Sequence, residues 1–310
     1  MTSVTVIGCV QADVLVSPVA ELPPPGGTIL TEQIGVRVGG AGANAALALA
    51  EAGMRVRLMG CVGDDVLGRW MRQELATVGL AGELVVTADG SSGLTVALES
   101  PERDRAFLTY LGVNAEWTPE MIPKDALDTE NLLLCDYFVA PRLQGEAAQD
   151  FLAATRSQGG RTFFDTAWDP GGFPAQTRVE VGQVLRFVDV FLPNEGEACA
   201  LAGVRPDGVR TAAEKLQRLS GGWVVVKLGA RGCLAVGPGD VRLEVPAPAV
   251  EIADTTGAGD AFNAELVHAL SDGAGWPEAL SAATEFASAV VARPSNERHR
   301  TPMANDISTE

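Results

Sequence analysis

The sequence predicts an α/β fold with a mostly parallel sheet that carries helices on both of its faces. Strand-like runs at 132–135, 161–164 and 188–192 alternate with helix-like segments such as 143–158. Such alternation is typical of parallel strands joined by helices that pack on the sheet. No linker, repeat or low-complexity segment divides the chain, so we expect one domain over residues 1–310.

Composition supports a buried core and argues against several classes of protein. Hydrophobic residues make up 46% of the chain, while 40 acidic against 23 basic residues give a net charge of −17. So acidic a protein is a poor ligand for nucleic acid or anionic membranes. The five cysteines are scattered and only two histidines exist, which argues against a disulfide framework or a histidine-rich metal site. No apolar run reaches about 18 residues, so we expect a cytoplasmic enzyme.

A small-residue turn, Asp254-Thr-Thr-Gly-Ala-Gly-Asp-Ala-Phe-Asn263, stands where a helix begins. The first amides of a helix have no internal partner and carry the positive end of its dipole. Glycines allow an anion to approach those amides closely. Asp260 lies beside the same amides, so the turn could hold a phosphate while the aspartate takes a proton from an attacking hydroxyl. A capped helix start without chemistry is the alternative.

A second glycine-rich turn, Gly39–Asn44, precedes the helix-forming run 45–52. Asn44 can both donate and accept hydrogen bonds, as a diol requires. Residues 40–45 also fit the Gly-x-Gly-x-x-Ala fingerprint of an NAD-dependent dehydrogenase. That fingerprint should close the first strand, and an acidic residue should close the second. Here the second expected strand, 56–61, runs into glycine and valine, so we rank the dehydrogenase second.

Polar side chains follow several of the expected strands. Asp13 follows the strand-like run 3–10, where a carboxylate can accept hydrogen bonds from sugar hydroxyls. Asn194 and Glu197 follow a later strand and would suit Mg²⁺, although Glu197 also suits the first turn of a helix. Lys227 ends another strand, where it can meet phosphates or extend into solvent.

Four extended segments break the alternation of strands and helices and predict a small separate sheet. They lie at 14–19, 28–38, 94–99 and 105–111. The last two flank a polar turn at 100–104 and predict a hairpin.

The decapeptide at 254–263 resembles the C-terminal signature of the ribokinase-like family of sugar and nucleoside kinases, the PfkB family. Gly39, Gly40 and Asn44 match the family's N-terminal Gly-Gly-x-x-x-Asn, and the chain is similar to the family over nearly its whole length. Gly112–Ala115 resembles the family's Gly-Ala-Asn-Ala. The chain departs from the pattern at Gln11, where Asn is usual.

Two further matches concern the nucleotide half. Asn194 and Glu197 match the family's Asn-x-x-Glu, and residues 227–232 resemble Thr-x-Gly-x-x-Gly with Lys227 in place of threonine. The resemblance implies ATP and Mg²⁺ as cofactors and a hydroxymethyl group of a ribose- or fructose-like sugar as acceptor. A nucleoside kinase is the alternative, and a non-catalytic sugar-binding protein ranks lower. No arginine stands near 165–170, which argues against a carboxylate-bearing sugar acid.

The resemblance assigns roles residue by residue. Catalysis falls to Gly257, Ala258, Gly259 and Asp260; acceptor binding to Asp13, Gly39, Gly40, Asn44 and Asn114; nucleotide binding to Asn194, Lys227, Gly229, Gly232 and Thr256.

Metal and partner roles also follow from the resemblance. Asn194 and Glu197 would position Mg²⁺ through water, and Asp254 would help bind a monovalent cation such as K⁺. The polar segment 293–302, which departs from the family pattern, would close over adenine. Segments 14–38 and 94–111 would form a lid over the sugar and could pair two copies of the chain.

Overall fold

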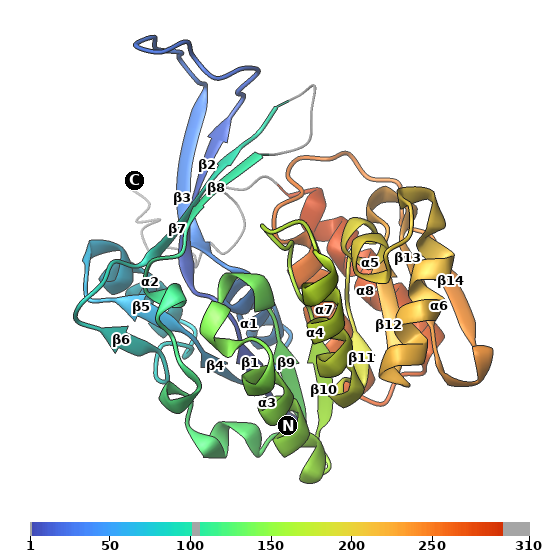
Figure 1. Cartoon of the computed structure of the whole chain (residues 1–310). Helices are drawn as coiled ribbons and strands as arrows, with labels where there is room; N and C mark the ends of the chain where they lie inside the picture. Colours follow the sequence, from blue (N-terminus) through green and yellow to red (C-terminus); the bar gives the residue numbers. More distant parts are fainter. Residues whose placement is uncertain (1, 101–105, 294–310) are drawn as a thin grey trace, which may run out of the picture.

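The computed structural model describes residues 2–100 and 106–293 (Figure 1). Its main sheet has eight strands in the order β14-β13-β12-β11-β10-β9-β1-β4. The strands from β12 to β4 are parallel, and β13 and β14 add an antiparallel edge. Their bounds are β1 Ser3–Ile7, β4 Arg55–Met59, β9 Asn131–Leu134, β10 Arg161–Phe164, β11 Val190–Phe191, β12 Trp223–Lys227, β13 Cys233–Val236 and β14 Arg242–Val245.

Helices cover both faces of this sheet, as expected, because successive strand residues point to opposite faces. Leu132 and Leu134 of β9 enter one hydrophobic core, and Leu133 between them enters the other. The first core is closed by α3 Glu146–Ser157, α4 Ala175–Val184, α5 Glu195–Ala202 and α6 Val209–Ser220. The second is closed by α1 Ala41–Glu51, α2 Val66–Ala76, α7 Ala258–Ser271 and α8 Trp276–Val291. No helix in the described ranges is long and apolar enough to cross a bilayer.

A separate four-stranded sheet, here called the lid, projects from the body (Figure 1). Its order is β3-β2-β7-β8, with bounds β2 Gln11–Ser17, β3 Gln33–Gly39, β7 Gly93–Leu98 and β8 Ala106–Tyr110. β7 and β8 form the expected antiparallel pair, and the turn expected at 100–104 lies outside the described residues after Ser100. Two short strands, β5 Cys61–Gly63 and β6 Val85–Thr87, form a third sheet.

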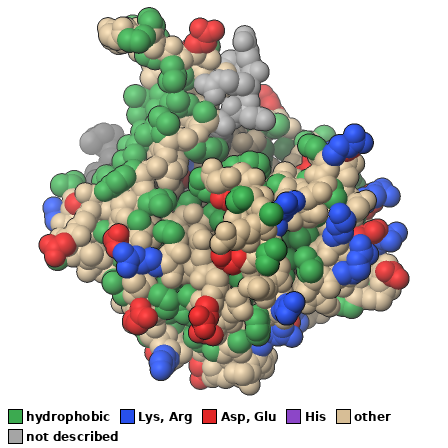
Figure 2. Space-filling model, in the orientation of Figure 1, with side chains coloured by type: hydrophobic (Ala, Val, Ile, Leu, Met, Phe, Trp, Pro, Cys, Tyr) green, Lys and Arg blue, Asp and Glu red, His purple; other side chains and the backbone are tan. Residues whose placement is uncertain are grey.

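The lid has two chemically different faces. One cross-strand row joins Arg37, Asp13, Thr95 and Thr109 and is polar. The next row joins Val36, Val14, Val96 and Leu108 on the opposite face and is apolar. Val36 is 53% exposed and Leu108 is 61% exposed, and hydrophobic side chains cover much of the projecting lid in Figure 2.

Two strand boundaries differ from expectation. The strand expected at 3–10 ends at Ile7, so Asp13 lies inside lid strand β2 and does not close a strand of the main sheet. Gly8 packs against the start of α1, since a Cβ on Gly8 would lie 2.7 Å from Cα of Gly42, and the chain leaves the sheet there. The strand expected at 56–61 likewise divides at Gly60 into β4 and β5.

Candidate active site

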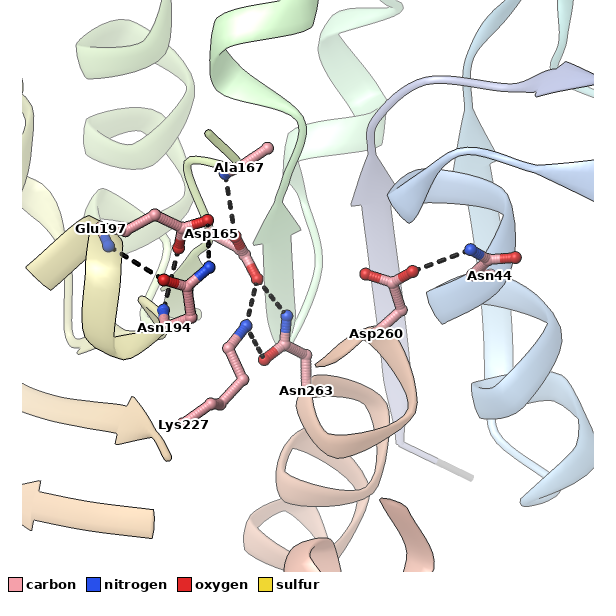
Figure 3. Close-up of polar contacts among 8 residues, drawn as sticks. All are labelled: Asn44, Asp165, Ala167, Asn194, Glu197, Lys227, Asp260 and Asn263. Atoms are coloured by element: carbon pink, nitrogen blue, oxygen red, sulfur yellow. Dashed lines mark hydrogen bonds and ion pairs between the residues drawn. The ribbon is translucent and has the colours of Figure 1, made fainter. Parts of the chain in front are cut away.

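The two glycine turns, remote in sequence, meet at the starts of α1 and α7. The side-chain amide of Asn44 donates a hydrogen bond from Nδ2 to Oδ2 of Asp260, over 2.8 Å (Figure 3). α7 begins after Gly257, whose φ of 74° suits glycine. A Cβ added to Gly257 would lie 3.6 Å from Nδ2 of Asn44. The tertiary fold therefore brings Asn44 against the turn that carries Asp260.

The α7 start leaves more of its first amides open to an external anion than the α1 start does: at α1 only the amide of Ala41 lacks an acceptor in the described residues. The carboxylate of Asp136 accepts hydrogen bonds from the amides of Cys9, at 2.9 Å, and Gly42, at 3.0 Å. At α7 the amide of Ala258 donates to the Thr255 carbonyl at 3.3 Å. The amides of Gly259 and Asp260 have no acceptor within the described ranges. The α7 turn is therefore the candidate anion site.

Asp260 is placed to act as a base. Burial raises the pKa of its carboxyl above the ordinary value, and the hydrogen bond from Asn44 opposes that rise. A raised pKa makes a carboxylate a stronger proton acceptor. Because Asn44 occupies one oxygen, Oδ1 of Asp260 is the atom left to meet a hydroxyl.

A buried cluster of charged and amide groups borders the other side of the α7 turn (Figure 3). Nζ of Lys227 lies 2.6 Å from Oδ2 of Asp165, and the Asn263 amide donates to the same oxygen at 2.5 Å. Nζ would also lie 3.6 Å from a Cβ on Gly259. Lys227 thus turns inward toward the anion site, and the expectation that it might extend into solvent is wrong.

The cluster keeps Lys227 charged. Burial alone would lower its pKa, but Asp165 and Glu197 outweigh burial, so the pKa of Lys227 is raised. For the carboxyl group of Glu197, burial and the neighbouring charge of Asp165 act in the same direction and raise its pKa to about 7.

Asn194 and Glu197 form a capping box at the start of α5. Oδ1 of Asn194 accepts from the Glu197 amide at 2.9 Å, and Oε2 of Glu197 accepts from the Asn194 amide at 2.9 Å. Within the described residues, no group of three His, Cys, Asp or Glu side chains could hold a metal ion directly. Both carboxylate oxygens of Glu197 accept hydrogen bonds from Asn194, so these two residues fit Mg²⁺ held through water and substrate phosphates, which is how that ion commonly binds.

On the lid side, Asp13 is held by its neighbours. Nε2 of Gln11 donates to Oδ1 of Asp13 at 3.2 Å and to Oγ1 of Thr95 at 2.7 Å. Burial raises the pKa of Asp13 to about 6, although Arg37 opposes the rise. Nε of Arg37 lies 4.0 Å from Oδ2 of Asp13.

The glycines of the N-terminal signature are required by packing within the protein. A Cβ on Gly39 would overlap the carboxylate of Asp13. Gly40 has a φ of 88°, and a Cβ there would overlap the Cys9 carbonyl. Their predicted contact with the acceptor stays a prediction.

The remaining predicted residues occupy varied positions. Asn114 is 0% exposed, and neither amide atom of its side chain has a partner in the described part of the chain. A Cβ on Gly232 would overlap the Val245 carbonyl, so this glycine serves packing, whereas Gly229 faces open space. The Thr256 amide donates to Oδ1 of Asp254 at 2.7 Å.

Three residues of this region had no role in the sequence analysis: Arg37, Asp136 and Asn263. Arg37 also lies with Nη1 3.7 Å from Oδ2 of Asp254. Asn263 stands three residues after Asp260, so helical spacing alone could have placed both on one face of α7. Asp136 follows β9 in a left-handed conformation, with φ of 59°. No sequence motif predicted its contacts.

A cavity of about 860 Å³ lies beside this site, between the lid and helices α1, α2, α7 and α8. Arg37, Asn44 and Gly257 line its polar end, and side chains such as Leu47, Trp70 and Phe286 line the rest. Asn44 and Gly257, which line the cavity, belong to the two signature turns. Asp13 and Asp260 are not among its lining residues.

Comparison with known proteins fits this geometry. The sequence model described as "pfkB family carbohydrate kinase" matches residues 1–299. The chain belongs to that family. Accordingly, it is a kinase that phosphorylates a sugar or nucleoside, and the dehydrogenase alternative is set aside.

Individual relatives agree along most of their length. The ribokinase of Haemophilus influenzae is 25% identical over 90% of this chain and 88% of its own, and that of Mus musculus is 29% identical over 87% and 82%. The solved ribokinase of Thermotoga maritima superposes with a TM-score of 0.79 at 26% identity, covering 94% of each chain. A Cryptococcus neoformans ribokinase in complex with ADP gives 0.78 at 25% identity, also over 94% of each chain. ATP is thus the phosphoryl donor that the family implies.

Removing the Lys227 ammonium should destabilise the folded protein. In Lys227→Met, Asp165 keeps a buried charge without its cation, so we expect the free energy of unfolding to fall by about 3–5 kcal/mol. Lys227→Met combined with Asp165→Leu should recover part of this loss, because the Asp165 charge is gone, although buried Glu197 still lacks the cation and Asn263 loses its acceptor. Urea unfolding measures both, and a loss under about 1 kcal/mol in the single variant would contradict a buried pair.

Proposed function

We propose that the chain transfers the γ-phosphoryl group of ATP to a hydroxymethyl group of a small, ribose- or fructose-like sugar. The hydrogen bond between Asn44 and Asp260 carries this proposal, because it joins the acceptor-side signature to the base and the anion turn. A nucleoside acceptor is the alternative. It is supported by similarity to the aminoimidazole riboside kinase of Salmonella typhimurium, 28% identical over 79% of this chain.

Asp260 is proposed as the catalytic base. The acceptor oxygen attacks the γ-phosphorus, its proton passes to Oδ1 of Asp260, and the bond from phosphorus to the bridging oxygen of ADP breaks. Gly257 sets the turn, and the open amides of Gly259 and Asp260 would stabilise charge on the transferring group. The amide of Ala258, proposed to act with them, would first have to leave the Thr255 carbonyl, to which it donates at 3.3 Å. One such preorganised donor can contribute about 3–4 kcal/mol to transition-state stabilisation.

Residues on the sheet side are proposed to hold the nucleotide. Lys227 would place its charge near the phosphates beside Gly259, and Gly229, two residues after Lys227, borders open space. Thr256 precedes Gly257 in the α7 turn, Gly232 closes the turn after β12, and Asn194 at the start of α5 pairs with Lys227 in an isolated β-bridge. Asn194 and Glu197 would hold Mg²⁺ through water; the ion would neutralise charge on the phosphates.

The lid side is proposed to hold the acceptor. Asp13, Asn44 and Asn114 supply polar atoms, and Gly39 and Gly40 bring the backbone close. Closure of the lid would exclude water, which otherwise could take the phosphoryl group.

Three accompanying roles are proposed on fewer contacts. The cation role of Asp254 stays a prediction, and Arg37 already places positive charge 3.7 Å from its carboxylate. The apolar outer face of the lid would pair two copies of the chain. A cytoplasmic location is supported by five buried free cysteines, which suit a reducing compartment.

Replacing the base should separate chemistry from binding. Asp260→Asn keeps the shape of the side chain but cannot accept the proton, so kcat should fall about 10²–10⁴-fold while ATP affinity changes little. The wild-type acceptor is first found by ADP release over sugars, polyols and nucleosides with Mg-ATP. Asp272→Asn, at the far end of α7, is the matched control. Turnover of Asp260→Asn near the wild-type rate would end the assignment.

The rate should depend on pH through two carboxylates. The pKa of Asp13 is raised to about 6, so this carboxyl gains a proton as pH falls through about 6, and the pKa of Asp260 is raised above its ordinary value as well. Protonated Asp13 loses acceptor capacity for the hydroxyls of the substrate, so kcat/KM for the acceptor should decrease below about pH 6, and protonation of Asp260, which could then no longer take the hydroxyl proton, acts in the same direction. Circular dichroism at each pH controls for unfolding. A constant kcat/KM down to about pH 5 would contradict this expectation.

Charge on the outer face of the lid should dissociate a dimer. Val36→Glu with Leu108→Glu places two carboxylates on the apolar row, and light scattering should then give the monomer mass where the wild type gives a dimer. Val179→Glu, on exposed α4, is the control. A wild type that is monomeric at all concentrations would exclude lid pairing.

A further inference from the structure

Arg37 presents an unusual pair of donors. Its side chain is 13% exposed, yet Nε and Nη2 are buried and have no hydrogen-bond partner. These two nitrogens form one edge of the planar guanidinium, so their N–H bonds point the same way. Buried donors of charged groups are rarely left unpaired, which indicates that a ligand is missing from this edge.

The guanidinium is anchored between the lid and the α7 turn. Arg37 and Asp13 are directly paired residues of β3 and β2, on the polar face of the lid. Nε lies 4.0 Å from Asp13 and Nη1 lies 3.7 Å from Asp254, both too long for hydrogen bonds. Arg37 is therefore held in place by charge, while Nε and Nη2, although covered by the protein, have no acceptor.

The charges around Arg37 limit what this edge can bind. Three carboxylates interact electrostatically with the Arg37 guanidinium: Asp13, Asp254 and Asp260. A fourth carboxylate, from an acidic substrate, would add to an excess of negative charge. A neutral pair of oxygens would bring hydrogen bonds without that repulsion.

We propose that Arg37 is a specificity-determining residue that, with Asp13, binds a vicinal diol of the acceptor. This inference rests on the proposed function. Each hydroxyl both donates and accepts. The hydroxyls of the diol would donate to the Asp13 carboxylate and accept from Nε and Nη2 of Arg37. Both protein groups would then be used in the positions they have in the structure. The substrate class is thus a sugar or nucleoside with two adjacent hydroxyl groups, and an acceptor that lacks one of them leaves a buried donor unpaired.

The test compares acceptors that differ by one hydroxyl. kcat/KM is measured with Mg-ATP for D-ribose and 2-deoxy-D-ribose, and in a second arm for adenosine and 2′-deoxyadenosine. The proteins are wild type, Arg37→Met, which removes charge and donors, and Arg37→Lys, which keeps the charge but lacks the planar edge. Arg210→Met, at an exposed surface ion pair with Glu244, is the control.

The wild type should prefer the diol in the active arm by about tenfold or more. Arg37→Met and Arg37→Lys should both bring this ratio close to one, mainly by reducing kcat/KM for the diol. Equal loss for both acceptors would show that Arg37 acts only through folding or general charge, and would overturn the proposal. So would a wild-type ratio near one. If the wild type phosphorylates none of the four acceptors but releases ADP with another sugar, the diol assignment of Arg37 fails while the kinase function stands; no ADP release with any sugar or nucleoside would instead overturn the proposed function.

Discussion

The arrangement of the site depends on the unpartnered amides at the start of α7 and on what stands around them. A helix start must satisfy its first amides with a cap, water or a ligand. At α1 the carboxylate of Asp136 and the carbonyl of Cys9 accept from the amides of Gly42 and Ala43, so only the Ala41 amide lacks an acceptor in the described residues. At α7 the described residues leave the amides of Gly259 and Asp260 open, with Asn44 on one flank and Lys227 on the other. Two similar glycine turns therefore differ in how many amides they leave open.

Charge is distributed to serve this open turn. The chain is strongly acidic, yet the groups nearest the α7 amides include two cations, Lys227 and Arg37. Each is held by carboxylates: Lys227 by Asp165, and Arg37 between Asp13 and Asp254. Paired in this way, the cations stay charged in partly buried positions without leaving net positive charge in the interior. An acidic protein can thus bind an anionic nucleotide locally.

The two faces of the lid have different chemistry. Its polar face presents Asp13 and Arg37 toward the body, while its outer face is apolar and exposed. This division follows from the two-residue period of a strand, which puts alternate side chains on opposite faces. One small sheet can therefore contribute to acceptor recognition on one side and to pairing of chains on the other.

The sequence by itself determined the α/β class, the small separate sheet and the kinase family, because alternating segments and two glycine signatures are local patterns. It placed Asp260 at a helix start for the same reason. Only the tertiary structure decided that Asp13 belongs to the lid, since β1 ends at Ile7 and Asp13 pairs with Arg37 and Thr95 in the lid sheet. It also decided that Lys227 turns inward and that Arg37 meets Asp13 and Asp254. Those contacts join residues far apart in the chain, and no local pattern specifies which distant carboxylate a cation will reach.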